Sequence, residues 1–529
     1  MKARPFFNYI AAVLLSLFLL TGGLLWGVDR RSPLRLAQQP MQLPRASLFV
    51  PRDADLSLHW LADPARLPAY VQAVAPPALR RAARDGARQW RDGVFALAGL
   101  DFEAELGNWL GPEVSLTLID AGDLRDQPGW VLALTSRDTD GARRFLQRFW
   151  QTRSLAGTDL QVSSYRGIGV ISGRGALLGR DAQPLATALI DDDLLLLASG
   201  RGVLEGALDV SQLQDHHQLG DEELQDQLNQ LGQGVALMTA SPRALKRWLD
   251  MPEEVAERQD LEGLVAALRP DGSDLSVNAL LRFRDPLEAE PWLAAPDSTL
   301  VAGGKSAVMA WLQNPSRLLD RDDQHPYVQW FGPLLRDHLA PIPAAAGVVS
   351  QDDGPLLWLQ QLEGWLLASR NGHPKRVEVD AELEAQGLSQ SDLPGDRETV
   401  QVWTRLVRQR GHGEKIAAQL SVATVEDGDW NWWGETLPTL THRHDSRALQ
   451  PRLRQWQQLR HETSPSQAVL MGEDPAQQLI RRWRPWTLLQ GLSGHPLQNR
   501  VRGLVLSVDG DAQAGGKPLL PLHARLELG

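Results

Sequence analysis

The sequence predicts an α+β fold made of two tandem pseudo-repeats, each an antiparallel sheet with amphipathic helices on one face, preceded by one transmembrane helix. Three observations predict it. An apolar run without charge occupies Ile10–Val28. The window Ser47–Leu67 aligns without a gap to Ser298–Leu318. After each window, pairs of strand-like runs alternate with single helix-like runs.

The predicted organisation follows the order of the chain. Its parts are residues 1–9, a basic tail; 10–28, a transmembrane signal anchor; 29–46, a proline-containing stalk; 47–285, repeat 1; 286–297, a linker; and 298–529, repeat 2.

The N-terminal run is long enough to cross a bilayer as a helix. Lys2 and Arg4 precede it and no A-x-A cleavage site follows it, which favours an uncleaved anchor. The anchor includes Ile10, Leu14, Phe18, Leu24, Trp26 and Val28. Because cationic residues flank both ends, the positive-inside rule does not select an orientation. A short basic tail followed by an apolar run is how export begins, so we expect a cytoplasmic N-terminus and the bulk of the single-pass protein in the periplasm or an equivalent lumen.

Each repeat is expected to open with a strand that enters a helix through a proline. In Asp63-Pro64 and Asn314-Pro315, the side-chain oxygen of Asp or Asn can cap the helix by accepting a backbone N–H of its first turn. The proline that follows has no N–H, so it leaves none unpaired. The same device recurs late in each repeat, at Ser241-Pro242 and at Asp474-Pro475.

Periodicity predicts the elements between these points. Repeat 1 is expected to have strands at 131–135, 160–163, 169–171, 185–190 and 194–198 and helices at 140–152 and 202–209. Repeat 2 is expected to have strands at 356–362, 363–369, 400–407, 417–425 and 430–433 and a helix at 446–459. Both repeats close with a hairpin around an Asp-Gly turn, over Gly263–Phe283 and Gly503–Leu528.

Two segments carry a resemblance. The stretches FVPRDADLSLHWLADPARL (Phe49–Leu67) and GLDFEAELGNWLGPEVSLTLI (Gly99–Ile119) resemble an uncharacterised, mainly cyanobacterial family of membrane-anchored extracytoplasmic proteins that carry a domain of unknown function. The resemblance covers most of residues 46–529, although Ala302-Gly303-Gly304 replaces the Pro-Arg-Asp opening in repeat 2. It implies anchoring and export, and it brings no functional residues because the family has no established activity.

Composition excludes several classes of function. A net charge of −11 argues against a nucleic-acid partner. The absence of cysteine excludes a disulfide-linked oligomer, thiolate metal sites and cysteine nucleophiles. The 19 tryptophans favour core packing, with an aromatic-lined pocket or a membrane-facing surface as the alternatives.

One candidate metal site stands out. His442 and His444 are two residues apart, so they face the same way on a strand, and Asp445 follows. The alternative is an exposed strand end at which Asp445 caps the next helix. Spacing fixes no further ligand.

One basic, aromatic cluster is a candidate membrane-surface patch, consisting of Arg481, Arg482, Trp483, Arg484 and Trp486. It could rest on anionic lipid head groups. Its position matches Lys246–Trp248 in repeat 1, so a repeated helix that packs its tryptophan and exposes its cations is the alternative.

The remaining motifs carry no chemistry on their own. Asp191-Asp192-Asp193 and Glu426–Asp429 are typical of solvated turns, with cation binding as the alternative. Gly200-Arg201-Gly202 and Gly303–Ser306 lack the spacing of phosphate-binding loops.

We therefore expect a membrane-tethered extracytoplasmic scaffold or binding protein that is non-catalytic and has no cofactor. Its partners would be the bilayer, through the anchor, and a protein or an apolar ligand. The alternatives are a carrier or sensor of an apolar ligand such as a lipid, because sheets covered by helices can enclose a pocket, and an envelope hydrolase.

Overall fold

The computed structural model describes most of the chain and divides it into two compact units. Unit 1 comprises Met1–Arg52, Leu58–Leu237 and Ala267–Ser273, and unit 2 comprises Asp53–Ser57, Met238–Ala266 and Asp274–Gly529. The residues whose placement is described are 33–38, 40–97, 100–119, 129–155, 159–175, 183–249, 251–287, 306–394, 399–409, 415–443, 450–483, 486, 500–509 and 518–528.

The predicted anchor, Ile10–Val28, lies outside these described residues. None of the helices that the structure describes has both the length and the apolar character that crossing a bilayer requires. Anchoring therefore stays a prediction.

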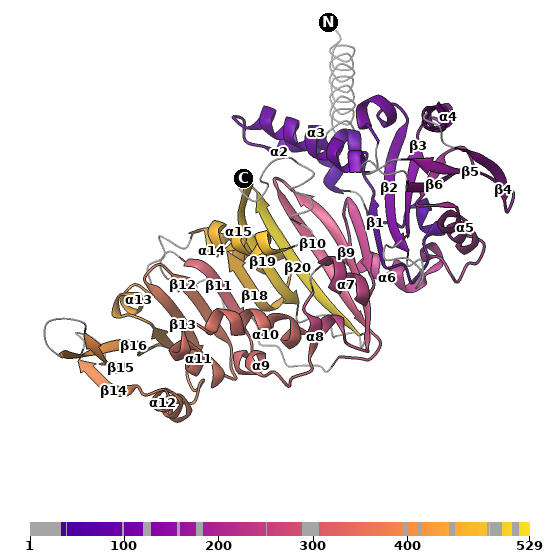
Figure 1. Cartoon of the computed structure of the whole chain (residues 1–529). Coiled ribbons are helices and arrows are strands. Elements are labelled where there is room, and N and C mark those ends of the chain that lie inside the picture. Colours follow the sequence, from indigo (N-terminus) through magenta and orange to yellow (C-terminus); the bar gives the residue numbers. More distant parts are fainter. Residues whose placement is uncertain are drawn as a thin grey trace, which may run out of the picture. The chain divides into compact units, whose positions relative to one another are not determined.

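The strands of unit 1 pair in the order β1–β2–β3–β7–β6–β5–β4, and every pairing from β2 to β4 is antiparallel (Figure 1). Their bounds are β1 Leu56–Trp60, β2 Leu110–Ile119, β3 Gly129–Ser136, β4 Gln161–Tyr165, β5 Ile168–Gly175, β6 Gln183–Ile190 and β7 Leu194–Ala198. β1, β8 (Ala236–Ala240) and β9 (Leu261–Asp271) each contribute residues to both units.

The strands of unit 2 pair in the order β10–β20–β19–β18–β11–β12–β13–β17–β16–β15–β14, and all of these pairings are antiparallel (Figure 1). Their bounds are β10 Asp274–Phe283, β11 Ser306–Leu312, β12 Leu356–Gln361, β13 Gly364–Arg370, β14 Ser389–Pro394, β15 Thr399–Gln409, β16 Lys415–Asp427, β17 Trp430–Gly434, β18 Pro465–Met471, β19 Val501–Asp509 and β20 Leu519–Leu528.

The run β11–β12–β13–β17–β16–β15–β14 in unit 2 has the same pairing order as β1–β2–β3–β7–β6–β5–β4 in unit 1. In both runs the third strand pairs with the seventh, and the fourth strand lies at the end. In both, a late strand, β8 or β18, pairs with the first. The predicted mixture of helices with a large antiparallel sheet is confirmed.

Helices cover both faces of the sheet in each unit, whereas the sequence predicted helices on one face. In unit 1, α3 (Arg80–Leu97), η4 (Phe102–Leu106) and α4 (Thr139–Leu155) pack on one face, and η2 (Arg45–Phe49) and α5 (Arg201–Val210) pack on the other. The one-face prediction was wrong because the central strands are apolar at consecutive positions. Leu132 and Leu134 of β3 face the first set, while Val131 and Ala133 face the second.

Unit 2 repeats this arrangement with more helices. One face packs against α7 (Pro242–Leu249), α8 (Glu253–Ala256), α9 (Pro315–Leu319), α10 (Pro326–Leu339), α11 (Pro343–Ser350) and α12 (Arg376–Ala385). The other face packs against α13 (Leu437–Thr441) and α14 (Gln450–Glu462). The remaining helices are η1 (Pro33–Gln38), η3 (Pro64–Arg66), α2 (Leu67–Val74), η5 (Gln218–Gly220), α6 (Glu222–Leu231) and α15 (Glu473–Arg482).

The predicted helix starts are confirmed at three of the four prolines. Asp63 accepts the N–H of Ala65, Asn314 accepts that of Arg317, and Ser241 accepts that of Ala244. At the fourth, α15 begins at Glu473 with Gly472 before it, so Asp474 is not the cap. Because the first-turn N–H groups have no partner within the helix, the proline at position 475 costs nothing there.

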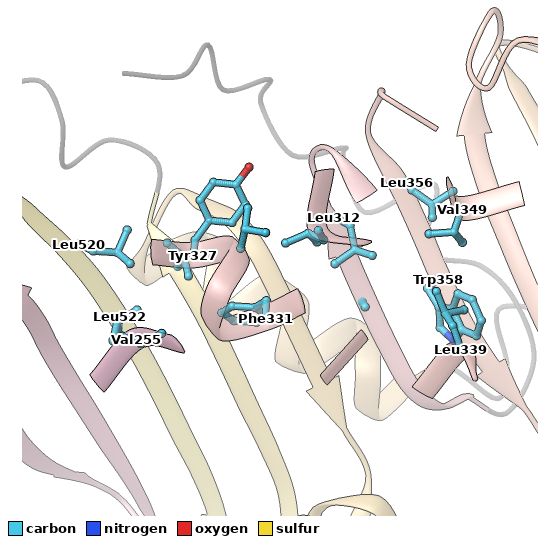
Figure 2. Packing of buried hydrophobic residues seen from close by; sticks show 14 of the residues in the cluster. Val255, Leu312, Tyr327, Phe331, Leu339, Val349, Leu356, Trp358, Leu520 and Leu522 are labelled. Carbon is cyan, nitrogen blue, oxygen red and sulfur yellow. The ribbon is translucent and has the colours of Figure 1, made fainter. Parts of the chain in front are cut away.

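Tryptophan fills the core of unit 2, as the favoured interpretation of its abundance predicts. Trp358 and Trp365 pack face to face from neighbouring strands, with ring centroids 6.2 Å apart. Figure 2 shows Trp358 beside Leu339 of α10, and Tyr327 and Phe331 on the same helix. Burying such side chains removes a large apolar area from water, so these contacts stabilise the unit.

A buried polar network holds β10 to β20 in unit 2. Nδ1 of His523 lies 2.8 Å from Oδ1 of Asn278, the residue directly opposite. Arg525 donates to Asp274 and to Glu462 of α14 at 3.1 Å each. A buried network in which every charge has a partner fixes the register of the pair.

Candidate functional site

The structure brings only part of the predicted metal site into view. His442 is exposed, and its Nδ1 lies 3.6 Å from Oε2 of Glu363, which is also exposed. His444 and Asp445 lie outside the described residues. The described part of this site is thus a surface contact between an imidazole and a carboxylate, and the metal assignment of His442, His444 and Asp445 stays a prediction.

The predicted membrane-surface patch is divided between surface and core. Arg481, Arg482 and Trp483 are exposed, whereas Trp486 packs in a cluster around Ile480. Arg484 lies outside the described residues. The cations Arg481 and Arg482 end α15 on the exposed side of the helix.

This patch adjoins the matching segment of repeat 1. The indole N–H of Trp483 donates to the carbonyl oxygen of Leu249 at 2.8 Å. Beside Leu249, along α7 and α8, is an open groove of about 620 Å³. Its lining includes the charged residues Arg243, Lys246, Arg247, Glu253 and Glu257. The groove is open and has charged side chains along its wall, so it does not have the enclosed character of a lipid cavity.

The acidic turns are neutralised by arginine. Asp191 and Asp193 pair with Arg45, and Asp192 pairs with Arg143. In unit 2, Asp427 accepts from Arg443 at 2.9 Å. Carboxylates engaged in this way are satisfied without a cation, which agrees with the interpretation of these segments as turns.

A cluster that the sequence did not single out lies at the open end of the β12–β13 hairpin. Asp352 and Asp353 end the connection from α11 into β12, and His373 follows β13. Each of the three offers one ligand atom, and these atoms all lie within 4.8 Å of one another. Nδ1 of His373 lies 2.6 Å from Oδ1 of Asp353.

Asp352 is the unusual member of this cluster because it is 0% exposed. Its Oδ1 accepts the N–H of Gly354 at 2.9 Å, and its Oδ2 has no hydrogen-bond partner among the residues that the structure describes. Burial raises the pKa of Asp352 to about 7, against the opposing effects of the Gly354 N–H and of His373. The carboxyl group is therefore poised to change charge near neutrality.

The backbone around the cluster leaves little spare room. A Cβ atom added to Gly354 would lie 2.9 Å from Cγ of His373. Asp353 and His373 remain open to solvent, with side chains 60% and 45% exposed. The site thus has a buried carboxylate at its base and two accessible ligands at its mouth.

The sequence offered a signal that periodicity alone does not expose. Asp352 and Asp353 precede a predicted hairpin and His373 follows it, about twenty residues away. Strand pairing of Leu356 with Ser369 then brings the two flanks together. Searching for ligand-type residues on both sides of each hairpin would have found the cluster.

Among the described residues of unit 1, His59 is a buried titratable group whose pKa is also shifted. His59 of β1 is 0% exposed, and its Nδ1 lies 2.8 Å from Oγ of Ser115. Its Nε2 lies 3.4 Å from Oε1 of Gln218. Burial lowers the pKa of His59 to about 4, so the ring is neutral at physiological pH. A satisfied, neutral histidine inside a sheet is a packing element.

The far end of each strand run is exposed. All six residues of β14 are exposed, and its one described pairing is with β15. On the β15–β16 hairpin, Leu406 is 72% exposed and Ile416 is 66% exposed. In unit 1, β4 pairs with β5 within the described residues, and its Val162 is 77% exposed. Both runs therefore present an edge strand with exposed apolar side chains.

Comparison with known proteins places the chain in a family. A family model described as "Protein of unknown function (DUF3352)" matches residues 9–515. The chain belongs to the DUF3352 family. This confirms the part of the resemblance that concerns a domain of unknown function. No protein of curated function matches the sequence.

Solved structures add no functional information about this DUF3352 protein. Three crystal forms of TP0453 are similar to it: form I at 9% identity with a TM-score of 0.27, form III at 7% with 0.26, and form IV at 8% with 0.25. Each match covers 46% of this chain and 80%, 80% and 81% of TP0453, respectively. TM-scores this low carry no argument about this chain.

Proposed function

We propose that the protein is a duplicated, membrane-tethered extracytoplasmic scaffold of the kind expected for an anchored, exported family, and that it binds protein partners through its sheet edges. Ile10–Val28 would hold it in the bilayer, with the bulk in the periplasm or an equivalent lumen. The duplication is supported by the matching pairing orders that begin with β1 and β11. The protein performs no chemical step in this proposal.

The observation that carries this proposal is the exposed hairpin end of unit 2. Leu406 pairs with Ala418 and Arg408 pairs with Ile416, so Leu406 and Ile416 lie on the same face of the hairpin. The adjacent Arg405, which points to the opposite face, is exposed too. A two-stranded ribbon that is exposed on both faces gains little stability from its own packing. It is suited to bind a partner.

The chemistry of the edge favours a partner segment in an extended conformation. A strand at the end of a sheet presents backbone N–H and C=O groups that another strand can pair with. All six side chains of β14 are exposed, so no side chain of this strand is committed to the core. Main-chain pairing would supply affinity, and the apolar face around Leu406 would supply specificity.

Neither alternative function has comparable support. A lipid carrier needs an enclosed apolar cavity, whereas the groove beside α7 is open and is lined by Lys246 and four other charged residues. A hydrolase needs a nucleophile, a base and a stabilising group that converge. Among the described residues, the Asp352 cluster brings together two carboxylates and an imidazole, which is the chemistry of a metal-binding site.

Site-specific photo-crosslinking in intact cells tests the proposal. A photoreactive residue at position 406 should give a discrete protein adduct, and one at position 377 should not. Val377 is a matched control because it is 80% exposed on a helix instead of a hairpin. Adducts with lipid alone, or equal adducts at both positions, would contradict the proposal.

Orientation has its own test. A reporter that is active only outside the cytoplasm, fused after Gly529, should be active. Activity of a reporter that works only in the cytoplasm would overturn the proposed location.

The carrier alternative has a separate test. Organic extraction of the purified protein should yield no stoichiometric lipid, and a bound lipid would favour the carrier instead.

A further inference from the structure

We propose that Asp352, Asp353 and His373 form a binding site for one divalent transition-metal ion of the Zn²⁺ class. The proposal does not depend on the proposed scaffold function. It rests on three observations: the convergence of the ligand atoms, an unpaired buried carboxylate oxygen, and the residues found at the corresponding corner of unit 1.

The ligand atoms are already close to a coordinating arrangement. Zn²⁺ lies about 2.0–2.2 Å from nitrogen and carboxylate ligands, so two ligands of a tetrahedral ion are about 3.4 Å apart. The three groups here lie within 4.8 Å of one another. Small side-chain rotations of the exposed Asp353 and His373 would therefore bring all three onto one ion. The ion would take the place of the proton shared by Nδ1 of His373 and Oδ1 of Asp353.

The buried carboxylate supplies the second, independent argument. Asp352 is 0% exposed, and the structure shows a hydrogen bond to Oδ1 only. Within the described residues, Oδ2 has no partner. A buried polar atom without a partner costs about 1–3 kcal/mol, and more when it is charged. Coordination of a cation would satisfy this oxygen, since buried charges in proteins are paired or bind metals.

The corresponding corner of unit 1 shows that the fold does not require a carboxylate there. Val114 of β2 pairs with Leu134, and Leu356 of β12 pairs with Ser369. The two pairs correspond because Leu134 and Ser369 in turn pair with the second residues of β7 and β17. Asp352 stands four residues before Leu356, and Leu110, which is also 0% exposed, stands four residues before Val114. The apolar residue is the one that packing favours at this place.

In unit 1 the carboxylate that follows β3 at this corner, Asp138, pairs with Arg144 at 3.0 Å, and hydrogen bonds to carbonyl groups make the other contacts. The backbone N–H of Arg137 donates to the carbonyl oxygen of Trp109 at 2.8 Å. Its guanidinium donates to the carbonyl oxygen of Gly107 at 3.3 Å. Ser136 also contacts the Trp109 carbonyl, at 3.4 Å. Hydrogen bonds to carbonyl groups hold the corner of unit 1 together, whereas the corner of unit 2 brings two carboxylates and an imidazole to the same place. A buried carboxylate at a position where packing favours an apolar residue indicates a functional site.

The donor set selects the class of ion. Mg²⁺ and Ca²⁺ prefer oxygen ligands throughout, and Ca²⁺ takes six to eight of them. An imidazole nitrogen with two carboxylates suits Zn²⁺ and its first-row neighbours. Three protein ligands leave a position for water at the exposed mouth of the site. The ion would join the α11–β12 connection to the segment that leads into α12, which precedes β14 and the β15–β16 hairpin.

Metal titration of the full chain tests the proposal. The purified protein in detergent is treated with a chelator, freed of it, and titrated with ZnCl₂ in a calorimeter. We expect one strongly bound Zn²⁺ per chain. His373→Ala and Asp353→Asn should each weaken this binding by about tenfold or more, since even residues that only support ligands contribute about 10–100-fold.

The matched control is His216→Ala, which removes another exposed histidine that belongs to no candidate site. It should bind Zn²⁺ as the wild type does. Hydrogen exchange in segments 351–358 and 369–376 should slow when Zn²⁺ is added to the wild type and to His216→Ala. Both exposed-residue variants should keep their exchange pattern elsewhere, which shows that they fold. Absence of stoichiometric binding, or binding that His373→Ala leaves unchanged, would overturn the proposal.

Discussion

Corresponding places in the two strand runs contain buried residues of opposite character. On β1, His59 is buried, and Ala310 is the buried residue that aligns with it on β11. At the start of β2, Leu110 is buried, and Asp352 is buried at the corresponding place before β12. At each of these two places, one strand run has a buried apolar residue and the other has a buried titratable residue. The fold therefore requires a buried side chain at these places but does not require it to be apolar.

The difference gives the two units opposite responses to pH. The pKa of His59 is lowered to about 4, so the unfolded state binds its proton more tightly and unit 1 loses stability as the pH falls from about 6.5 to 4. The pKa of Asp352 is raised to about 7, so the native state binds its proton more tightly and unit 2 loses stability as the pH rises from about 4 to 7. The contribution of Asp352 therefore stabilises unit 2 in acid, and the contribution of His59 stabilises unit 1 at neutral pH.

The largest effect is expected when a carboxylate is placed in unit 1 at the position that corresponds to Asp352 of unit 2. Leu110→Asp should lower the free energy of unfolding of unit 1 by about 5 kcal/mol at pH 8, because it buries a charge that has no partner there. The loss should be smaller at pH 4, where the carboxyl group is protonated. Region-resolved hydrogen exchange over β2 and β3 measures the effect. A loss below about 2 kcal/mol would show that this corner tolerates a charge.

The reciprocal change removes the ionisable carboxyl group of Asp352 from unit 2. Asp352→Asn keeps the shape of the carboxyl group and removes its ionisation. In the presence of a chelator, unit 2 should become more stable by roughly 4 kcal/mol at pH 8, the equivalent of a pKa shift from 3.8 to about 7. At pH 4 the variant and the wild type should be alike. Exchange over β12 and β13 measures this, with Asp353→Asn as the exposed control.

If Asp352→Asn changes the stability of unit 2 equally at pH 8 and pH 4, ionisation of Asp352 is not the cause of the change. Asp353 and His373 are the titratable groups that face Asp352, and both affect its pKa. Repeating the measurement in His373→Ala separates their contribution.

The histidine of unit 1 should have a somewhat smaller effect. Between pH 6.5 and 4, unit 1 should lose about 3 kcal/mol of stability through His59, because protonation of the buried ring is disfavoured. His59→Gln should flatten this dependence whatever its effect at neutral pH. Exchange over β1 and β2 as a function of pH is the measurement. A pH dependence that survives in the variant would assign it to another group.

The smallest effect concerns a contact outside both corners. Asn278→Ala removes the hydrogen-bond partner of Nδ1 of His523 between β10 and β20 and should cost about 1 kcal/mol in unit 2. Exchange at residues 519–528 reports it. Leu406→Ser is the control, since an exposed substitution of this kind should stay within about 0.5 kcal/mol. Equal effects of the two changes would show that the contact contributes nothing.

The sequence predicted what depends on local chemistry. Asp63, Asn314 and Ser241 form the caps expected of them, because a cap and its helix lie within a few residues. It failed where two segments must meet. Consecutive apolar residues such as Leu356 and Leu357 show a buried strand, but they do not show which helices cover each face.

The cluster around Asp352 escaped prediction for the same reason. The sequence singles out His442 because His444 is near it, whereas Asp352 and His373 meet only through the pairing of β12 with β13. Buried groups such as His59 and Asp352 look like ordinary polar residues until tertiary packing removes them from water.

The antiparallel pairing of β10 with β20 is self-complementary. The two strands have the same length, and Asn278 and His523, each the fifth residue of its strand, face one another. Two corresponding strands that meet in this way have the geometry of a two-fold dimer interface, in which the same surface serves both partners. Joined in one chain, they associate without any dependence on protein concentration. Separated modules ending in either strand would expose an open edge and dimerise through it.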